Sequence, residues 1–266
     1  MIKCNPNPID LKGLLDGSPA SISSREGAVP SVKARLLVDC RCHLGECVIW
    51  DNRQNAVLFT SILDHKFHKL VLSKNDNTKL ESYTLDKMLC AFGLLDASQG
   101  YIVAWEDGFQ LYNLEKRIPL GPMSKGEVVN RSGLPDRLND GRVDPSGRRF
   151  VCGGCAASSN APLKVYKCEY DSAINGLKHS IILERILTTN SICWSSSGEE
   201  MYIADSPCKN IQKFDYNLDE GTIENGKVLH AKKCGFPDGV RDCSLMPTLF
   251  VKNRTTFWKG FPFEEF

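Results

Sequence analysis

The sequence lacks long apolar runs and has almost no net charge, and both features narrow what the protein can do. No window approaches the roughly 18 apolar residues needed to span a bilayer, and residues 1–24 lack the apolar core of a secretory signal. The 33 basic and 32 acidic residues leave a formal net charge of +1. We therefore expect a cytoplasmic protein with a small-molecule ligand and no nucleic acid or membrane partner.

Several signatures of catalytic sites are also missing. No Gly-x-Ser-x-Gly follows a predicted strand, no glycine-rich phosphate loop opens a helix, and the five histidines show no ligand spacing. The 12 cysteines are scattered through a chain long enough to build a core, so reduced thiols are expected. We interpret the Cys-x-x-Cys pair, Cys152 and Cys155, as small apolar strand residues.

A sequence plan repeats along the chain. A polar residue is followed by a short run with Trp or Val, then a turn rich in Asp, Asn or Ser, then a second apolar run. The spacings between Glu46, Asn139, Asn190 and Asp238 are 93, 51 and 48 residues. Because the first spacing is close to twice the others, a further repeat is expected near residue 91, which makes five openings.

The repeats have the periodicity of strands. Short alternating runs occupy residues 101–105, 109–114, 201–206 and 211–217, and turn residues separate them. Four strands per unit at this period are typical of a β-propeller blade, in which equivalent positions of all blades meet near the central channel. The sequence therefore predicts an all-β protein with few helices.

The chain is short for a complete propeller of six blades. Six units would need about 290 residues, whereas about 230 remain after residue 34. We expect a flexible N-terminal extension over 1–34, a first strand at 34–39, a propeller domain over 35–240 and a divergent tail over 241–266. About five blades are visible, and the chain is interpreted as truncated at its C-terminus.

Four oxygen-bearing side chains stand at the repeat openings. Glu46, Asn139, Asn190 and Asp238 would converge at the mouth of a propeller channel despite their separation in sequence. Each taken alone is more often a turn former, but recurrence at one blade position favours a functional reading. Two carboxylates with amide oxygens suit calcium, magnesium or manganese, and they point to metal-assisted hydrolysis.

Four motifs in order carry a family resemblance. They are Leu44–Trp50, Arg137–Gly141 continued by Asp144 and Gly147-Arg148, Asn190–Ser195, and Pro237–Gly239. Together they resemble the senescence marker protein, regucalcin, gluconolactonase and luciferin-regenerating enzyme family. The sequence departs from the family pattern where Cys47-Val48 replaces Gly-Pro and where Ser191 replaces Gly.

The resemblance implies a six-bladed propeller, incomplete in this chain, with one divalent cation in the channel. It implies that Glu46, Asn190 and Asp238 hold the cation and that Arg137 and Asn139 contact the substrate. Calcium is the first expectation for the cation, with magnesium, manganese and zinc as alternatives. We further expect Asp238 to act as the general base.

Three functions are compatible with this reading. The first is hydrolysis of a sugar lactone, with the cation polarising the carbonyl. The second is a non-catalytic propeller of regucalcin type that binds calcium or another ligand. The third is an interaction scaffold, and unclosed blade edges would also permit self-association. Arg137 and Asn139 favour the enzyme.

Overall fold

The protein is built from antiparallel β-sheets. The computed structural model describes residues 36–73, 78–95, 100–125, 136–156, 162–231 and 236–239, without the side chains of residues 230 and 231. Within these ranges every regular element is a strand, and none contains a helix that could cross a membrane. The predicted extension over 1–34 and the predicted tail over 241–266 lie outside the described residues.

The described strands form four sheets, which we call blades 1 to 4 in chain order. Blade 1 contains β1 (Gly45–Asp51), β2 (Ala56–Ser61), β3 (Lys66–Val71) and β4 (Lys79–Thr84). Blade 2 contains β5 (Leu89–Leu94), β6 (Tyr101–Trp105), β7 (Gly108–Asn113), β8 (Ile118–Pro119) and β9 (Ser124–Lys125). Blade 3 contains β10 (Arg137–Val143), β11 (Arg149–Cys155), β12 (Leu163–Asp171) and β13 (Gly176–Ile186). Blade 4 contains β14 (Thr189–Trp194), β15 (Glu200–Asp205), β16 (Asn210–Asn217) and β17 (Thr222–Ala231).

The hairpins that open three of the blades use the turn residues that the sequence indicated. Asn55, Gly147 and Gly198 precede the second strand of blades 1, 3 and 4, with φ of 49°, 68° and 78°. Glycine and asparagine adopt this left-handed region most readily. The Asp, Asn and Ser turns of the repeat plan are therefore confirmed as the links between the first and second strands.

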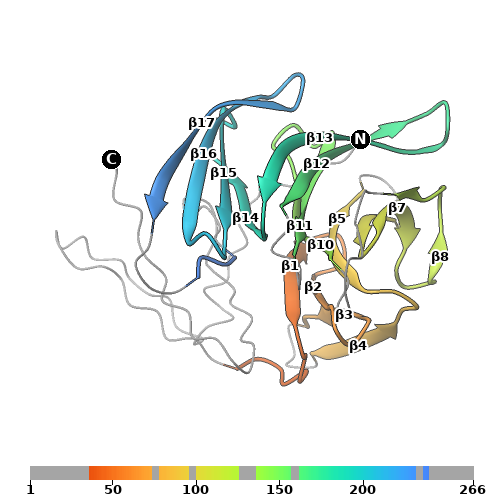
Figure 1. Ribbon diagram of the computed structural model, residues 1–266. Coiled ribbons are helices and arrows are strands. Elements are labelled where there is room, and N and C mark those ends of the chain that lie inside the picture. The colour runs from red at the N-terminus through yellow and green to blue at the C-terminus, as the bar shows by residue number, and fades with distance from the viewer. Residues whose placement is uncertain are drawn as a thin grey trace, which may run out of the picture.

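The four blades lie side by side in an open arc. Figure 1 shows blades 1 and 4 at the two ends of this arc, with β1, β5, β10 and β14 nearest its centre. The predicted all-β propeller fold is confirmed, the four sheets of the described residues do not close into a ring, and the further repeat expected near residue 91 is blade 2. The described strands form four blades, and the residues that would continue a fifth blade after its opening, Pro237–Gly239, lie outside the described part of the chain.

The hydrophobic core is divided among the spaces between neighbouring blades. Between blades 1 and 2, the rings of Phe67, Phe92 and Tyr101 meet edge to face, with centroids 5.5 to 5.9 Å apart. All three side chains are almost fully buried. Edge-to-face packing of this kind adds to the free energy that burial of the rings contributes. Each inner strand is thus held by apolar packing on its neighbour.

The segment before β1 differs from the prediction. A first strand was expected at 34–39, whereas residues 36–44 belong to no strand. Leu36 and Leu37 are exposed, because no strand in the described part of the chain pairs with them. Further along, Val38 packs on the outer face of blade 1, against Val57 and Phe59. The apolar pattern at 34–39 therefore indicates packing on blade 1, but a strand forms only where a partner strand supplies backbone hydrogen bonds.

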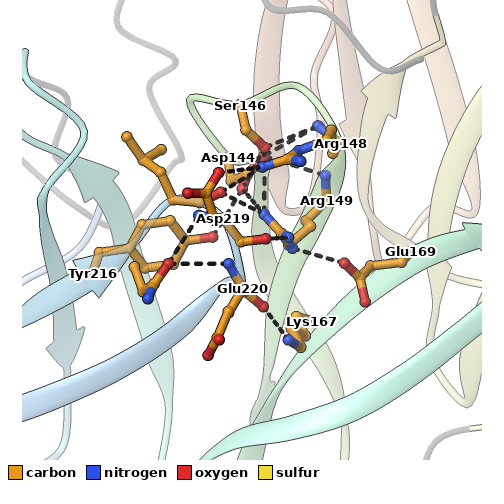
Figure 2. Close-up of polar contacts among 11 residues, drawn as sticks. Asp144, Ser146, Arg148, Arg149, Lys167, Glu169, Tyr216, Asp219 and Glu220 are labelled. Atoms are coloured by element: carbon orange, nitrogen blue, oxygen red, sulfur yellow. Dashed lines mark hydrogen bonds and ion pairs between the residues drawn. The ribbon is translucent and has the colours of Figure 1, made fainter.

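A buried ion pair in blade 3 is hydrogen-bonded to residues of blade 4 (Figure 2). Asp144 follows β10, and its carboxylate accepts hydrogen bonds from Arg149 Nη1 at 3.3 Å and from Tyr216 Oη at 2.9 Å. The Arg149 guanidinium also donates to Glu169 at 2.7 Å and to the carbonyl of Leu218 at 2.9 Å. Because Tyr216 and Leu218 come from blade 4, this network fixes the distal end of β10 to the next blade.

A similar pair of an aspartate and an arginine links blade 1 to blade 2. Asp51, the last residue of β1, is fully buried and accepts a hydrogen bond from Arg53 Nε at 2.9 Å. Arg53 Nη1 donates to the carbonyl of Leu95 in blade 2 at 2.8 Å. An aspartate at the end of an inner strand thus orients an arginine that reaches the neighbouring blade. In β1 and β10 the opposite end of the strand carries the predicted site residues.

Candidate functional site

A β-bulge lies at the start of each of the three inner strands that carry predicted site residues. The pairing register shifts between Glu46 and Ile49 in β1, between Leu138 and Gly141 in β10, and between Asn190 and Cys193 in β14. Bulges turn side chains away from the regular alternation of a strand and are common beside functional sites. The register also shifts between Leu89 and Ala91 in β5, so a bulge near the start of the inner strand is common to all four described blades.

The pairing register of the inner strands tests the prediction that Glu46, Asn139 and Asn190 occupy equivalent positions in their blades. Glu46 and Asn190 are both the last regularly paired residue before the bulge. In β10 that position belongs to Leu138, and Asn139 follows inside the bulge. The equivalence is therefore correct for Glu46 and Asn190 and displaced by one residue for Asn139.

Two residues next to the site adopt left-handed backbone conformations. Cys47 follows Glu46 with φ of 50°, and Ser191 follows Asn190 with φ of 57°. Glycine adopts this region without steric cost, which gives a physical reason for the glycine of the family pattern at both positions. Cys47 Sγ accepts a hydrogen bond from the backbone N of Phe92 at 3.2 Å, and Ser191 Oγ donates to the carbonyl of Asp238.

A chain of hydrogen bonds connects three predicted site residues. Arg137 Nη1 donates to Asn139 Oδ1 at 2.6 Å, and Asn139 Nδ2 donates to Asn190 Oδ1 at 3.0 Å. Asn190 Nδ2 in turn donates to Ser206 Oγ at 2.7 Å, and Ser206 Oγ donates to the carbonyl of Pro237 at 2.5 Å. The chain therefore runs from blade 3 through blade 4 to the segment that carries Asp238.

The carboxylates of the site influence one another through their charge. Burial raises the pKa of Glu46 to about 8, and the negative charges of Asp238 and Asp140 act in the same direction while Arg137 opposes them. Burial also raises the pKa of Asp238, the Gly239 N–H at 2.8 Å opposes this, and Asp140 adds to it. The site thus gathers carboxyl groups whose burial and mutual repulsion oppose their ionisation.

Sequence reasoning missed two residues of this site. Asp140 lies inside the motif Arg137–Gly141 but was not predicted as a site residue, although a carboxylate beside Asn139 is a signal for a charged site. Ser206 carried no signal, because its role depends on the backbone of Pro237, 31 residues further along the chain. The structure brings Glu46, Asn139 and the other predicted site residues to one region, and their individual roles stay predictions.

The donor chemistry of the site fits a divalent cation. With Glu46, Asp140 and Asp238 ionised beside Arg137, the local charge is −2, which a divalent cation would balance. In the described residues, no group of three or more His, Cys, Asp and Glu side chains is placed to hold a metal ion by itself. An amide oxygen, from Asn190 above all, would have to complete the set of oxygen ligands.

The open arc of antiparallel four-stranded sheets, with acidic side chains near the start of its inner strands, places the protein in the class of propeller-type proteins. The chain matches the family described as SMP-30/Gluconolactonase/LRE-like region over residues 44–241, and it belongs to this family. The resemblance inferred from the four motifs is confirmed.

Curated relatives include regucalcins and a protein described as a putative sugar lactone lactonase. The chain is 28% identical to regucalcin of Oryctolagus cuniculus over 217 residues, which cover 79% of this chain and 68% of the relative. It is 23% identical to the putative sugar lactone lactonase YvrE of Bacillus subtilis (strain 168), covering 78% of this chain and 67% of the relative.

Solved structures support the fold. The match to luciferin-regenerating enzyme has a TM-score of 0.62 at 21% identity and covers 76% of this chain and 66% of that chain. The match to regucalcin from Agrobacterium tumefaciens, described as a calcium-binding protein, has a TM-score of 0.59 at 22% identity and covers 74% and 62%. The chain thus spans less than two thirds of the length of these two proteins.

Proposed function

We propose that the protein hydrolyses a sugar lactone with the help of one divalent cation, calcium in the first place. Membership of a family that includes gluconolactonases supports the substrate class. The observation that carries the proposal is that Glu46 lies close enough to Asp238 and Asp140 for their charges, together with burial, to raise its pKa. Such a cluster of carboxylates is stabilised when a cation replaces the proton.

Glu46, Asn190 and Asp238 would hold the cation, whose contribution when bound is to polarise the lactone carbonyl. Asp238 accepts a proton from the attacking water, whose oxygen forms a bond to the carbonyl carbon. The ring carbon–oxygen bond then breaks, and the same proton passes to the leaving ring oxygen. The product is the open hydroxy acid, so water is the only co-reactant.

Arg137 and Asn139 would position the sugar. Arg137 Nη1 donates both to the carbonyl of Leu138 at 2.9 Å and to Asn139 Oδ1, which holds the guanidinium in one orientation. Asn139 is fixed from the other side, because its Nδ2 donates to the carbonyl of Thr189 at 2.8 Å. Groups oriented in advance lose little entropy when they hydrogen-bond a substrate.

A non-catalytic propeller that binds calcium is the second candidate. The Agrobacterium tumefaciens regucalcin is described as a calcium-binding protein, and the oxygen ligands proposed here suit that ion. The two candidates share the cation site and differ in Arg137, Asn139 and the use of Asp238 as a base. Turnover of a lactone decides between them.

The experiment compares gluconolactone hydrolysis by the wild type, Asp238→Ala and Asp219→Ala. Asp219 is an exposed carboxylate of blade 4, outside the proposed site, and serves as the matched control. We expect Asp238→Ala to lose at least a hundredfold in kcat/KM while Asp219→Ala retains wild-type activity, since general-base catalysis contributes about 10²- to 10⁴-fold. Undiminished turnover by a folded Asp238→Ala would contradict the proposal.

A further inference from the structure

Two thiols meet on the outer face of blade 1. The Sγ atoms of Cys40 and Cys42 lie 3.4 Å apart, and both residues are half-buried free cysteines. A disulfide requires about 2.05 Å between the sulfur atoms, so a movement of little more than about 1 Å separates this pair from a covalent bond.

The backbone between the two cysteines brings the sulfur atoms together without the support of a sheet. Arg41 adopts a φ of 51°, and its N–H donates to Asp39 Oδ1 at 3.3 Å. Residues 36–44 belong to no strand. Closure of the sulfur pair would therefore break no hydrogen bond of a β-ladder.

Asp64 anchors one side of the pair to the β2–β3 turn. The backbone N–H of His43 donates to Asp64 Oδ2 at 3.0 Å, and the His43 ring contacts the same carboxylate. Ser61 Oγ also donates to Asp64 Oδ2, at 2.5 Å, and Ser61 is a hydrogen-bond partner of Cys42. This connected set of polar side chains holds the Cys42 end of the segment on blade 1.

The Cys40 end of the segment is held by apolar contacts. Cys40 and Cys42 both pack against the cluster that contains Val57 and Phe59 on the outer face of blade 1. The pair therefore lies on the face of blade 1 that is turned away from blade 2. None of the residues in the proposed lactone site belongs to this cluster.

We propose that Cys40 and Cys42 form a dithiol site that reacts with small disulfides and closes to an intramolecular disulfide. The Cys40 thiolate attacks one sulfur of the small disulfide and releases the first small thiol. The Cys42 thiolate then attacks Cys40 Sγ in the mixed disulfide and releases the second. Two electrons pass from the cysteines to the small disulfide, and the two cysteine protons are balanced by the two thiols formed.

The surroundings of the thiols indicate the order of attack. Burial raises the pKa of Cys42 to about 12, and the hydrogen bond and charge of Cys40 act in the same direction. A thiol with a raised pKa is a poor first nucleophile, so Cys40 reacts first. Once Cys40 is in a mixed disulfide, its thiol no longer contributes to the raised pKa of Cys42.

The experiment uses the full chain, incubated with oxidised glutathione, alkylated and digested with trypsin without reduction. Trypsin cuts after Arg41, so Cys40 lies in peptide 36–41 and Cys42 in peptide 42–53. We expect the two peptides joined, two hydrogens lighter than their sum, with fragmentation placing the bond at Cys42 rather than Cys47. Recovery of both peptides alkylated, or each carrying glutathione without the bond, would overturn the proposal.

Two variants separate the dithiol site from ordinary thiol exchange. Cys208→Ser removes an exposed single thiol in blade 4, and we expect it to retain the joined peptides. Cys42→Ser should lose the joined peptides and instead accumulate glutathione on Cys40. Joined peptides that persist in Cys42→Ser would assign the bond to another cysteine and contradict the proposal.

Discussion

The side-chain amide of Asn139 in blade 3 donates a hydrogen bond to Asn190 Oδ1 in blade 4, 3.0 Å away. The same nitrogen donates to the carbonyl of Thr189. One amide group thus sets the distance between two inner strands at the point where the proposed ligand Asn190 leaves the sheet. The geometry of the proposed site depends on this contact between blades.

Loss of the Asn139 amide should therefore impair activity more than stability. We expect Asn139→Ala to lower kcat/KM for gluconolactone at least tenfold and to lower the free energy of unfolding by about 1 to 2 kcal/mol, the cost of lost hydrogen bonds to partly buried groups. Urea unfolding and initial rates measure the two effects. The exposed Asn52→Ala in the β1–β2 turn should change neither. Equal activity of the two variants would remove Asn139 from the site.

Proton and cation should compete for Glu46. A carboxyl whose pKa is raised on folding binds its proton more tightly in the folded state, so its contribution to stability is greatest below the unfolded value of 4.5. This contribution is lost as the pH rises towards about 8. We expect chelator-treated wild type to lose thermal stability between about pH 5 and about pH 8, relative to Glu46→Gln.

Bound calcium should abolish the loss of thermal stability that the wild type shows at high pH relative to Glu46→Gln. Melting curves with chelator and with excess calcium, at both ends of the pH range, measure it in the wild type and in Glu46→Gln. Cation affinity of the wild type should rise with pH over the same range, because the cation must displace the proton. If the wild type and Glu46→Gln show the same dependence of melting temperature on pH in chelator, the pKa of Glu46 is not raised by folding.

The left-handed conformation at Ser191 predicts that glycine is more stabilising than alanine at this position. Both Ser191→Gly and Ser191→Ala lose the hydrogen bond to the Asp238 carbonyl, but only glycine adopts a φ of 57° without strain. We expect the free energy of unfolding to be about 1 kcal/mol higher for Ser191→Gly than for Ser191→Ala.

Ser180 supplies the matched control, since it is exposed in β13 and has no positive φ. There the order should reverse, with the glycine variant about 0.5 to 1 kcal/mol less stable than the alanine variant. Urea unfolding of the four variants checks both orders. The same order at Ser191 and Ser180 would contradict the account of the bulge in β14.

The buried arginine between blades 3 and 4 should contribute strongly to stability. Arg149→Met leaves Asp144 buried without its ion-pair partner, and removal of one member of a buried pair costs about 3 to 5 kcal/mol. The neighbouring Arg148 side chain is 49% exposed, so Arg148→Met should cost less than about 1 kcal/mol. Chemical denaturation compares the two, and equal losses would show that the Asp144 pair is not the junction between the blades.

The sequence predicted the fold because each blade repeats a local pattern. The apolar runs and turns around Glu46 and Asn190 report strands and hairpins without knowledge of distant residues, and the register confirms that these two positions are equivalent. The bulge that displaces Asn139 by one residue could not be predicted, because it appears only when β10 is paired with β11. Local patterns therefore give the strands but not their register.

Contacts between blades also could not be predicted from the sequence. The Asp144 carboxylate meets Tyr216 Oη across 72 positions of the chain, and Ser206 meets the carbonyl of Pro237. Neither pair has a spacing or a motif that marks it. The first strand expected at 34–39 failed for a related reason, since an alternating run forms a strand only beside a partner.

The central claim is that lactone hydrolysis by this chain depends on a divalent cation at the site of Glu46, Asn190 and Asp238. The most direct measurement is gluconolactone hydrolysis by the purified full chain, first after chelator treatment and then with calcium, magnesium, manganese or zinc restored one at a time. The account predicts that chelation abolishes turnover and that a divalent cation, calcium first, restores it. Turnover that survives complete removal of the cation, or a folded protein that no cation activates, would contradict the account.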